Sequence, residues 1–564
     1  MRPVISTRLI RRRRRMRRLA TTIAVVVVLA GVAGYRLVAG DDGGASAGAS
    51  ERVSGLRPCD VPLDVLERVA RGYYPRRSGD VMVVDWVPNQ FAGLRHSTPH
   101  PYTQNVPLVL YGPGFVRAGA TPSAEATVAD LAPTYAELLG FDEWPERDGR
   151  VLSEALLPRA ERPDAPRLIF HLVWDGGGDD VLEQWPNAWP NLRRMMARGA
   201  SYADATVGSS PSITPAVHST MGTGAFPARH GITDMVLRDR RGKIVLAFGE
   251  ADPRYLLLPT IGDLWDRANG NAPLVGFMAK DSYHLGMLGH GAGLPGGDHD
   301  VAVIDKAHTI AFRTNEELFT LPDYVTIDES LDAAVAEIDQ RDGEADGKWL
   351  GHELDPTNDR IRYSPVWPIF QTQKMIEILA NEGFGADDVP DLFFANVKST
   401  DLVGHEWNMA DPEERDTLRE QDRQLAVLLD ALDRLVGRGN YVVALTADHG
   451  MNPYPSTTGG WAIDSGEVTA DVERRFDRPG GRPIVNTNRG YQLMLNRDEL
   501  RRSGVTAADV ARFVRAQTIR DNVPDGEPVP EAFRDRADER LFMTALTPAE
   551  LDAALSCARR RAGG

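Results

Sequence analysis

Aspartates and histidines, which are common zinc ligands, follow three strand-like runs in this chain. The runs are LIFHLVW, DLFFANV and YVVALTA, and the residues after them are Asp175, Asp401 with His405, and Asp448 with His449. Because the carboxyl ends of parallel strands meet at one edge of a sheet, we expect these side chains to converge. One aspartate after a strand is usually a turn or helix-capping residue. Three such stretches together predict a metal site, which suits zinc and also accepts manganese.

A stretch rich in glycine and hydroxyl groups, residues 208–232, precedes a helix-like segment. A hydroxyl at a helix N-terminus beside a metal ion is poised to attack phosphorus, because the helix dipole and the ion both favour an oxyanion and an incoming phosphate. Composition alone leaves five candidate nucleophiles open: Ser209, Ser210, Ser212, Thr214 and Ser219.

Strand-like and helix-like segments alternate along the chain, which predicts an α/β fold with a doubly wound, largely parallel sheet and helices on both faces. The expected strands are 81–87, 106–111, 168–174, 273–278, 391–397 and 441–446. The expected helices are 128–139, 192–198, 412–436 and 507–517. The proline- and charge-rich stretch 157–166 looks like a surface connector between two blocks.

The N-terminus carries the signals of a membrane-targeted protein. Residues 1–18 form a basic segment with nine arginines, and 19–39 predicts a transmembrane anchor, with an uncharged core of 17 residues from Leu19 to Tyr35. That core is at the short end of the roughly 17–25 residues that span a bilayer, and a cleaved signal peptide is the alternative. Basic residues before the segment and acidic residues after it place the domain outside the cytoplasm. We therefore expect a single-pass membrane protein, or a secreted one if the segment is cleaved.

The remaining chain divides into a linker and one large domain. Residues 40–56 are rich in glycine, alanine and serine and predict a flexible linker, and 57–564 predicts the catalytic domain. The whole chain has a net charge of −16 although its N-terminal segment is basic, so the rest is strongly acidic and we expect no nucleic-acid partner. The sequence leaves the oligomeric state open.

These stretches resemble the alkaline phosphatase superfamily, especially its nucleotide pyrophosphatase/phosphodiesterase branch with a threonine nucleophile. The family's nucleophile motif is matched by Pro211, Ser212, Thr214 and His218, and then by TG at 223–224, Pro227 and HGI at 230–232. Its D-x-x-G-H and D-H-G-M motifs match 401–405 and 448–451, and its last histidine segment matches 96–113, with Thr103 in place of aspartate. The resemblance covers most of residues 60–550 and implies that Thr214 is the nucleophile.

The order of these motifs differs from that of the family, in which the histidine segment comes last. His449 is the final histidine of this chain, and the matching segment lies upstream of Asp175. We therefore predict a circularly permuted domain, with 57–156 as the permuted segment and 167–564 as the remainder with insertions. The motif favours His96 over His100 as the missing ligand.

The resemblance implies two Zn²⁺ ions, with Mn²⁺ as an alternative. One ion would bind His96, Asp401 and His405, and the other Asp175, Asp448, His449 and Thr214. The implied reaction is hydrolysis of phosphate esters through a phospho-threonine, with a small-molecule ester, a nucleotide or a lipid head group as substrate.

Three departures from the family pattern bear on the substrate. Met235 stands where the family often has a phosphate-binding asparagine. Val217 stands before His218, where the family commonly has asparagine or glycine. The K-D-R triplet of the threonine monoesterases appears here as Lys280-Asp281-Ser282. Lys280 could still contact phosphate, or it could be solvated or salt-bridged. These losses favour a phosphodiester or pyrophosphate bond over a monoester. A phosphomonoesterase, a transferase acting on envelope lipid or glycan, and an inactive membrane-tethered binding protein are the alternatives.

The two cysteines lie near opposite ends of the predicted domain, Cys59 after the linker and Cys557 before the C-terminus. In an unpermuted relative the segments around them would be almost consecutive, so permutation would leave two loose ends side by side. Because disulfides persist outside the cytoplasm, we expect a Cys59–Cys557 bridge.

Overall fold

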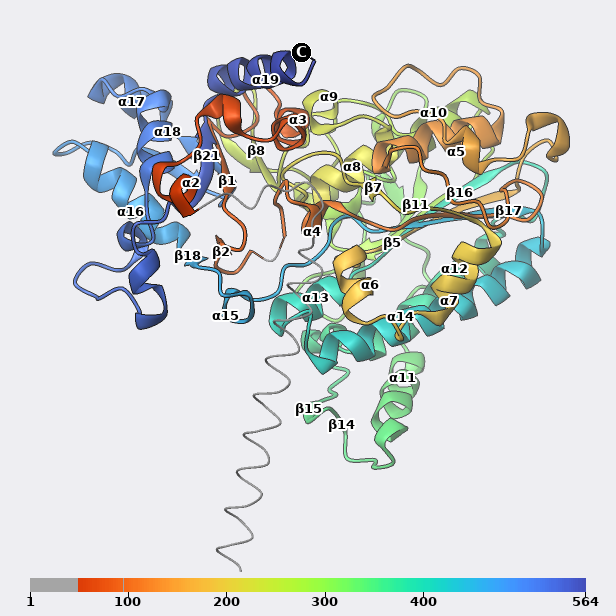
Figure 1. The fold of residues 1–564 in the computed structure, drawn as a ribbon. Helices are drawn as coiled ribbons and strands as arrows, with labels where there is room; N and C mark the ends of the chain where they lie inside the picture. The colour runs from red at the N-terminus through yellow and green to blue at the C-terminus, as the bar shows by residue number, and fades with distance from the viewer. Residues whose placement is uncertain (1–48, 95, 564) are drawn as a thin grey trace, which may run out of the picture.

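The computed structural model describes residues 49–94 and 96–563, and a nine-stranded sheet forms its centre (Figure 1). The strands in order across the sheet are β12 (Phe312–Arg313), β11 (Asp300–Asp305), β10 (Val275–Lys280), β16 (Asp391–Val397), β5 (Leu168–Trp174), β17 (Tyr441–Thr446), β3 (Leu108–Tyr111) and β6 (Ala200–Tyr202), with β13 (Phe319–Thr320) beside β11. The strands β10, β11, β16, β5 and β17 pair in parallel. The predicted α/β fold with a largely parallel sheet is therefore present, as a mixed sheet.

Helices cover both faces of this sheet. On one face lie α5 (Leu131–Leu139), α8 (Thr214–Thr223) and α10 (Ile261–Ala268), and on the other α6 (Asp179–Gln184), α7 (Pro190–Arg198), α12 (Val366–Glu382) and α14 (Pro412–Leu432). Successive residues of β5 point to opposite faces, so Ile169 and Val173 enter one core while Phe170 and Leu172 enter the other. This two-sided burial explains why every residue of the strand except His171 is apolar.

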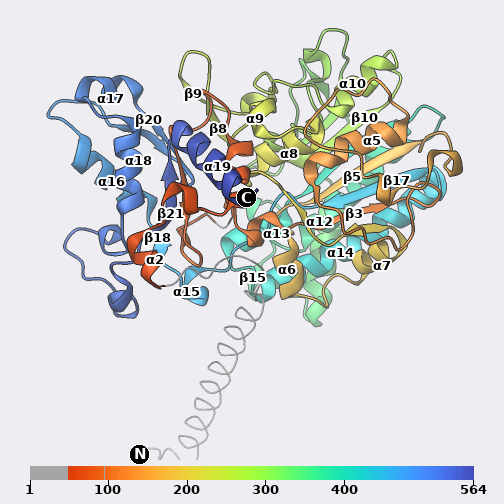
Figure 2. The ribbon, with the colours of Figure 1, turned by 45° about the horizontal axis from the view of Figure 1, so that its top comes forward.

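A second, antiparallel sheet of four strands lies beside the first (Figures 1 and 2). Its order is β19 (Val485–Asn488), β20 (Gln492–Leu495), β1 (Val81–Asp85) and β21 (Phe542–Leu546). One face packs against α16 (Ser465–Phe476), α17 (Arg497–Ser503) and α18 (Ala507–Ala516), and the other against α3 (Leu63–Gly72) and α19 (Pro548–Ala562).

Two of the expected strands are present but lie outside the parallel part of the central sheet. The strand expected at 81–87 belongs to the second sheet, where it pairs antiparallel with β20 and β21. The strand expected at 106–111 joins the central sheet but runs antiparallel to β17. The strand β1 is buried on both faces, as parallel strands are, so its composition resembles theirs.

Part of the predicted flexible linker is helical, since α2 spans Ala49–Ser54. The carbonyl of Arg52 accepts a hydrogen bond of 2.7 Å from the backbone N–H of Arg540, which connects α2 to the segment before β21 of the second sheet. The predicted basic segment 1–18 and membrane segment 19–39 lie outside the described residues. Among the residues that are described, no helix has the length and apolar character needed to cross a bilayer.

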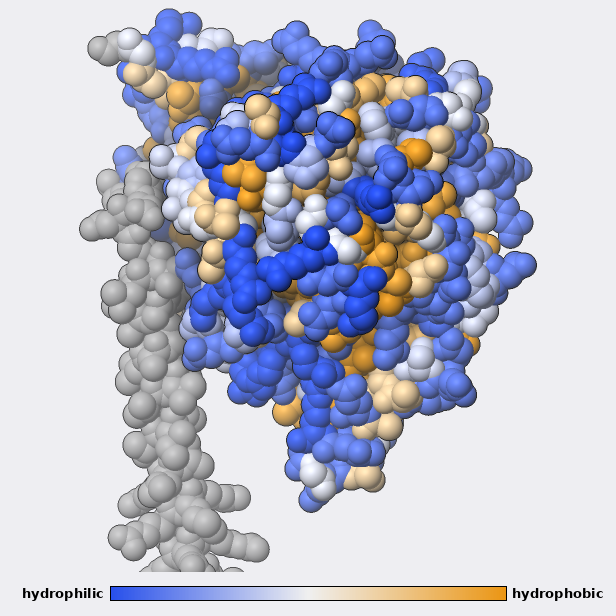
Figure 3. Space-filling model, turned by 90° about the vertical axis from the view of Figure 1, so that its right-hand side faces the viewer, coloured by the Kyte–Doolittle hydropathy of each residue, from blue (hydrophilic) through white to orange (hydrophobic). Residues whose placement is uncertain are grey.

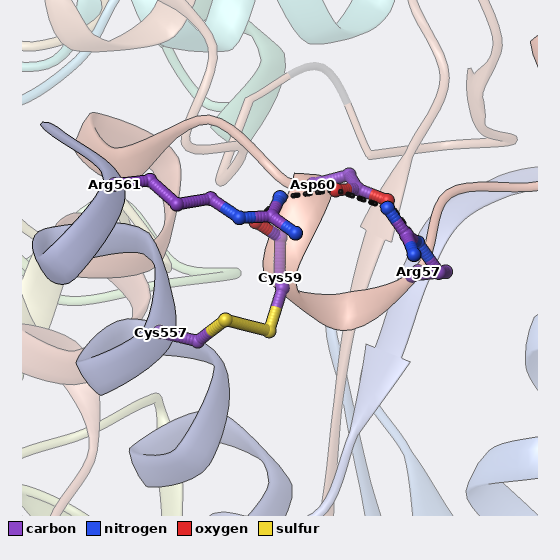
Figure 4. The surroundings of a disulfide bond; sticks show 5 residues. All are labelled: Arg57, Cys59, Asp60, Cys557 and Arg561. Atoms are coloured by element: carbon purple, nitrogen blue, oxygen red, sulfur yellow. Dashed lines mark hydrogen bonds and ion pairs between the residues drawn. A yellow bond between two sulfur atoms is a disulfide. The ribbon is translucent and has the colours of Figure 1, made fainter.

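The predicted disulfide is present and joins the two ends of the described chain (Figure 4). Cys59 lies in the short helix η1 (Pro58–Asp60) and Cys557 in α19, with their Cα atoms 5.6 Å apart. Arg57 and Arg561 both pair with Asp60 beside the bridge.

The face seen in Figure 3 is mostly hydrophilic, with hydrophobic residues gathered in a narrower band.

Candidate active site

The site residues lie at the carboxyl ends of three neighbouring strands, β5, β16 and β17. Asp175 follows β5, Asp448 and His449 follow β17 closely, and α13 (Ser399–Glu406), which carries Asp401 and His405, follows β16. In Figure 1, α13 and the short helix α4 (Pro101–Gln104) lie between the two sheets. The convergence expected from the sequence is therefore observed.

The first of two ligand clusters consists of His96, Asp401 and His405. Asp401 Oδ1 lies 3.3 Å from His405 Nε2 and 3.8 Å from His96 Nε2. The Nδ1 of His96 is 3.1 Å from the carbonyl oxygen of Ser212, a contact in which Nδ1–H donates and Nε2 is left free for a metal. Burial and the neighbouring His449 hold the pKa of His96 well below its usual range, so the ring is neutral. The structure places His96 as the family motif predicts.

The second cluster consists of Asp175, Asp448 and His449, all fully buried. His449 Nε2 lies 3.3 Å from Asp448 Oδ2 and 3.6 Å from Asp175 Oδ1. The Nδ1 of His449 is 3.1 Å from the carbonyl of Gly450, so the Nε2 lone pair again faces the cluster. Gly176 has a φ of +70°, and a Cβ there would lie 3.0 Å from the Cα of Asp401. This glycine lets the two clusters approach each other.

Buried atoms without hydrogen-bond partners show that both clusters fit a cation. Asp401 Oδ1, Asp448 Oδ2 and His449 Nε2 are buried, and among the described residues they contact other cluster residues without forming a hydrogen bond. Burial and the adjacent Asp175 carboxylate raise the pKa of Asp448 well above its usual range. Buried polar groups are nearly always satisfied, so such atoms call for an explanation. Bound metal ions, for which oxygen and imidazole donors are suited, supply one.

Asp175 is held from its other side by hydrogen bonds. Its Oδ2 accepts from the Nδ2 of Asn396 at 2.9 Å and lies 3.1 Å from the Nε2 of His284. Asn396 Nδ2 is also 3.1 Å from the Nε2 of His218. These buried side chains orient the carboxylate and fill the space behind it. They therefore support the ligands, and the sequence did not single out Asn396.

Thr214 is the first residue of α8. Its Oγ1 accepts a hydrogen bond of 3.3 Å from the Nζ of Lys398. Of the alternative hydroxyls, Ser212 donates to the carbonyl of Thr98 and Ser219 to that of Pro215. Unlike these two serine hydroxyls, that of Thr214 contacts Lys398, which pairs with a carboxylate of each cluster.

Lys398, which the sequence did not indicate, lies between the two clusters. It directly precedes α13, and its Nζ lies 2.8 Å from Asp175 Oδ1 and 2.9 Å from Asp401 Oδ2. Burial alone would lower the pKa of this ammonium, but Asp175, Asp401 and Asp448 raise it, so the group is charged. A lysine three residues before a ligand aspartate is the only sequence signal that could have drawn attention to it.

Two other predicted residues pair with residues outside the two clusters. The Nε2 of His100 is 3.0 Å from the carbonyl oxygen of Asp85, so this histidine supports the fold near β1. Lys280 pairs with Asp281 at 2.9 Å, which is one of the alternatives expected for it. Its contact with substrate phosphate stays a prediction.

Comparison with known proteins places the chain in a family. The model of type I phosphodiesterase / nucleotide pyrophosphatase matches residues 170–546. The chain belongs to this family. The block that carries His96 lies before the matched region.

Alkaline phosphatases are among the relatives of this chain. It is 26% identical over 407 residues to alkaline phosphatase PafA of Elizabethkingia meningoseptica, covering 62% of this chain and 73% of that protein. It is 25% identical over 329 residues to alkaline phosphatase PhoD of Zymomonas mobilis, covering 51% and 54%. The crystal structure of wild-type PafA shares the fold, with a TM-score of 0.51 and 22% identity over 68% of this chain and 84% of that one. With the family match, these relatives make the protein a phosphoric ester hydrolase of the alkaline phosphatase superfamily.

Proposed function

We propose that this protein is an extracytoplasmic, metal-dependent hydrolase of phosphodiester or pyrophosphate bonds. The observation that carries the proposal is the position of Thr214. Its hydroxyl is linked through Lys398 to one carboxylate from each ligand cluster, Asp175 and Asp401. Ions held by the two ligand clusters would stabilise the attacking and leaving oxygens of a displacement at this hydroxyl.

The ligand sets follow from the two clusters. His96, Asp401 and His405 would hold one ion, and the second cluster with the Thr214 oxygen would hold the other. Zinc suits these donors, and manganese is the alternative. Bound ions supply positive charge to the attacking and leaving oxygens of an in-line displacement.

The reaction has two steps at Thr214. In the first, Oγ1 forms a bond to phosphorus, the bond to the leaving oxygen breaks, and the hydroxyl proton passes to solvent while the leaving oxygen gains one. In the second, a water oxygen attacks phosphorus, the bond to Oγ1 breaks, and the threonine hydroxyl is restored. Thr214 lies at the N-terminus of α8, where the helix dipole favours the negative charge of both steps.

The disulfide and the chain order support two further parts of the proposal. A Cys59–Cys557 bridge fits a compartment in which disulfides persist, outside the cytoplasm. The contribution of His96 from a block upstream of the family match, together with the bridge between the two ends, supports a circular permutation. Membrane anchoring through 19–39 stays a proposal, as does a lipid head group as substrate.

The test compares hydrolysis of p-nitrophenyl phosphate with that of bis-p-nitrophenyl phosphate after metal removal and re-addition of zinc or manganese. We expect zinc-dependent hydrolysis with a higher kcat/KM for the diester. A higher kcat/KM for the monoester would favour a phosphomonoesterase, the function that the names of PafA and PhoD suggest. Hydrolysis of neither ester with any metal would contradict the proposed function.

A further inference from the structure

Lys398 is a buried ammonium in contact with the proposed nucleophile. Its Nζ contacts three oxygens, from Asp175, Asp401 and Thr214, at 2.8, 2.9 and 3.3 Å. Its side chain is only 14% exposed. Among the described residues, no other lysine or arginine forms an ion pair with the aspartates of the two clusters.

The other positions from which a charge or a donor was expected face elsewhere. Ser282, in place of an arginine, donates its hydroxyl to the carbonyl of Phe248 at 2.8 Å. Lys280 is paired with Asp281, and Met235 carries no donor on its side chain. The fixed positive charge seen beside the nucleophile is therefore that of Lys398.

We propose that Lys398 is a catalytic residue that binds a non-bridging oxygen of the transferred phosphoryl group. This inference rests on the proposed function. A phosphoryl group bonded to Thr214 Oγ1 has its other oxygens two bonds from that atom, and Nζ already lies at hydrogen-bond distance from the same atom. An ammonium has three donors, so it can contact the phosphoryl oxygen while it keeps both carboxylates.

The contacts with Asp175 and Asp401 hold the ammonium in place before substrate arrives. A long, flexible lysine side chain otherwise loses conformational entropy when it binds, and a preorganised donor is therefore more effective. The same contacts reduce the repulsion between two carboxylates that belong to different clusters. Hydrogen bonds to charged groups typically contribute about 1.5–3 kcal/mol, which corresponds to roughly 10- to 150-fold in affinity or rate.

The experiment measures binding, metal content and turnover for Lys398→Met, which keeps the length of the side chain and removes its charge. Binding of inorganic phosphate is measured by calorimetry in the zinc-loaded Thr214→Ala background, in which no phospho-threonine can form. Metal content is measured by plasma mass spectrometry. We expect phosphate affinity to fall about 10- to 100-fold and kcat for the preferred ester to fall by at least as much, with zinc content unchanged.

Two further variants separate catalysis from folding. Lys374, also buried and paired with two carboxylates, lies in α12, and Lys374→Met should leave phosphate affinity and kcat unchanged. Lys398→Arg retains the charge, so it should recover part of the phosphate affinity that Lys398→Met loses.

Three results would overturn the proposal. Zinc content that falls in step with activity would make Lys398 a residue that only positions the ligands. Zinc content that rises would mean that the ammonium occupies a metal position. Unchanged phosphate affinity in Lys398→Met, with ester hydrolysis by the wild type, would show that Lys398 does not contact the phosphoryl group and would leave the proposed function intact. A wild-type protein that hydrolyses neither ester would instead contradict the proposed function itself.

Discussion

The bridge between Cys59 and Cys557 should be a major source of stability for this domain, because it closes almost the whole chain into one loop. The two residues are 498 positions apart. The chain-entropy relation for such a loop gives a loss of roughly 21 cal/mol/K in the unfolded state, or about 6 kcal/mol at 298 K. Measured disulfides contribute about 2–4 kcal/mol, so we expect an effect within or somewhat above this range.

Other contacts at the junction are too weak to replace the bridge. Arg559 pairs with Glu67 at 3.0 Å, and Arg561 pairs with Asp60, both at exposed positions. Exposed ion pairs contribute about 0–1 kcal/mol each. The apolar contact between α3 and α19 does not depend on the bridge itself, so we expect it to persist after reduction. The two helices should therefore stay in contact while the domain becomes easier to unfold.

Urea denaturation followed by tryptophan fluorescence measures this effect. The protein with both cysteines changed to serine should have a free energy of unfolding at least about 2 kcal/mol lower than that of the oxidised wild type, because 2 kcal/mol is roughly the lower end of the measured contributions of disulfides. Reduced wild-type protein should match the double variant, and reducing agent should not affect the double variant. Equal unfolding free energies for oxidised wild type and the double variant would refute the reasoning.

Two further predictions concern the nucleophile and a group of carboxylates remote from it. Thr214→Ala should lower kcat by at least about 10³-fold with zinc content unchanged, while Ser212→Ala should keep most of the activity; the reverse pattern would reassign the nucleophile. Burial and the adjacent Asp298 raise the pKa of Asp266 to about 7. The stability contributed by this carboxyl is present below its unfolded pKa, near 4, and is lost as the pH rises through about 7. Asp266→Asn should therefore raise the melting temperature at pH 8 and leave it unchanged at pH 4. Equal shifts of the melting temperature at both pH values would contradict this prediction.

The sequence predicted the metal clusters because their residues follow strands. Asp175, Asp401 and Asp448 each follow an apolar run within four residues, and the geometry of a parallel sheet brings such positions together. His96 required the family motif as well, because no strand pattern links it to β16 or β17. His96 and His100 are both buried, and burial alone would not separate them.

The second sheet was not predicted, because its strands come from distant parts of the chain. The strand β1 pairs with β20 and β21, which lie more than 400 residues later in the sequence. The apolar composition of β1 indicates that the strand is buried, but it does not indicate which strands pair with β1.

Lys398 and Asn396 were missed for a related reason. Both occur in the stretch that contains Asp401, and their importance depends on the direction of each side chain in the folded site. Lysine side chains are mostly exposed to solvent, so the position of Lys398 three residues before Asp401 was too weak a signal to predict an ammonium between the two ligand clusters.

Metal content of the His96→Ala variant tests the central claim most directly, because this histidine joins the N-terminal block to the site. The matched control is His100→Gln, since His100 is also buried but contacts Asp85 instead of the clusters. After zinc loading and dialysis, we expect about two ions per chain for the wild type and the control, and about one for His96→Ala, with hydrolysis of bis-p-nitrophenyl phosphate lost in step. Zinc content and hydrolysis equal to those of the wild type in His96→Ala would contradict both the ligand assignment and the permuted arrangement.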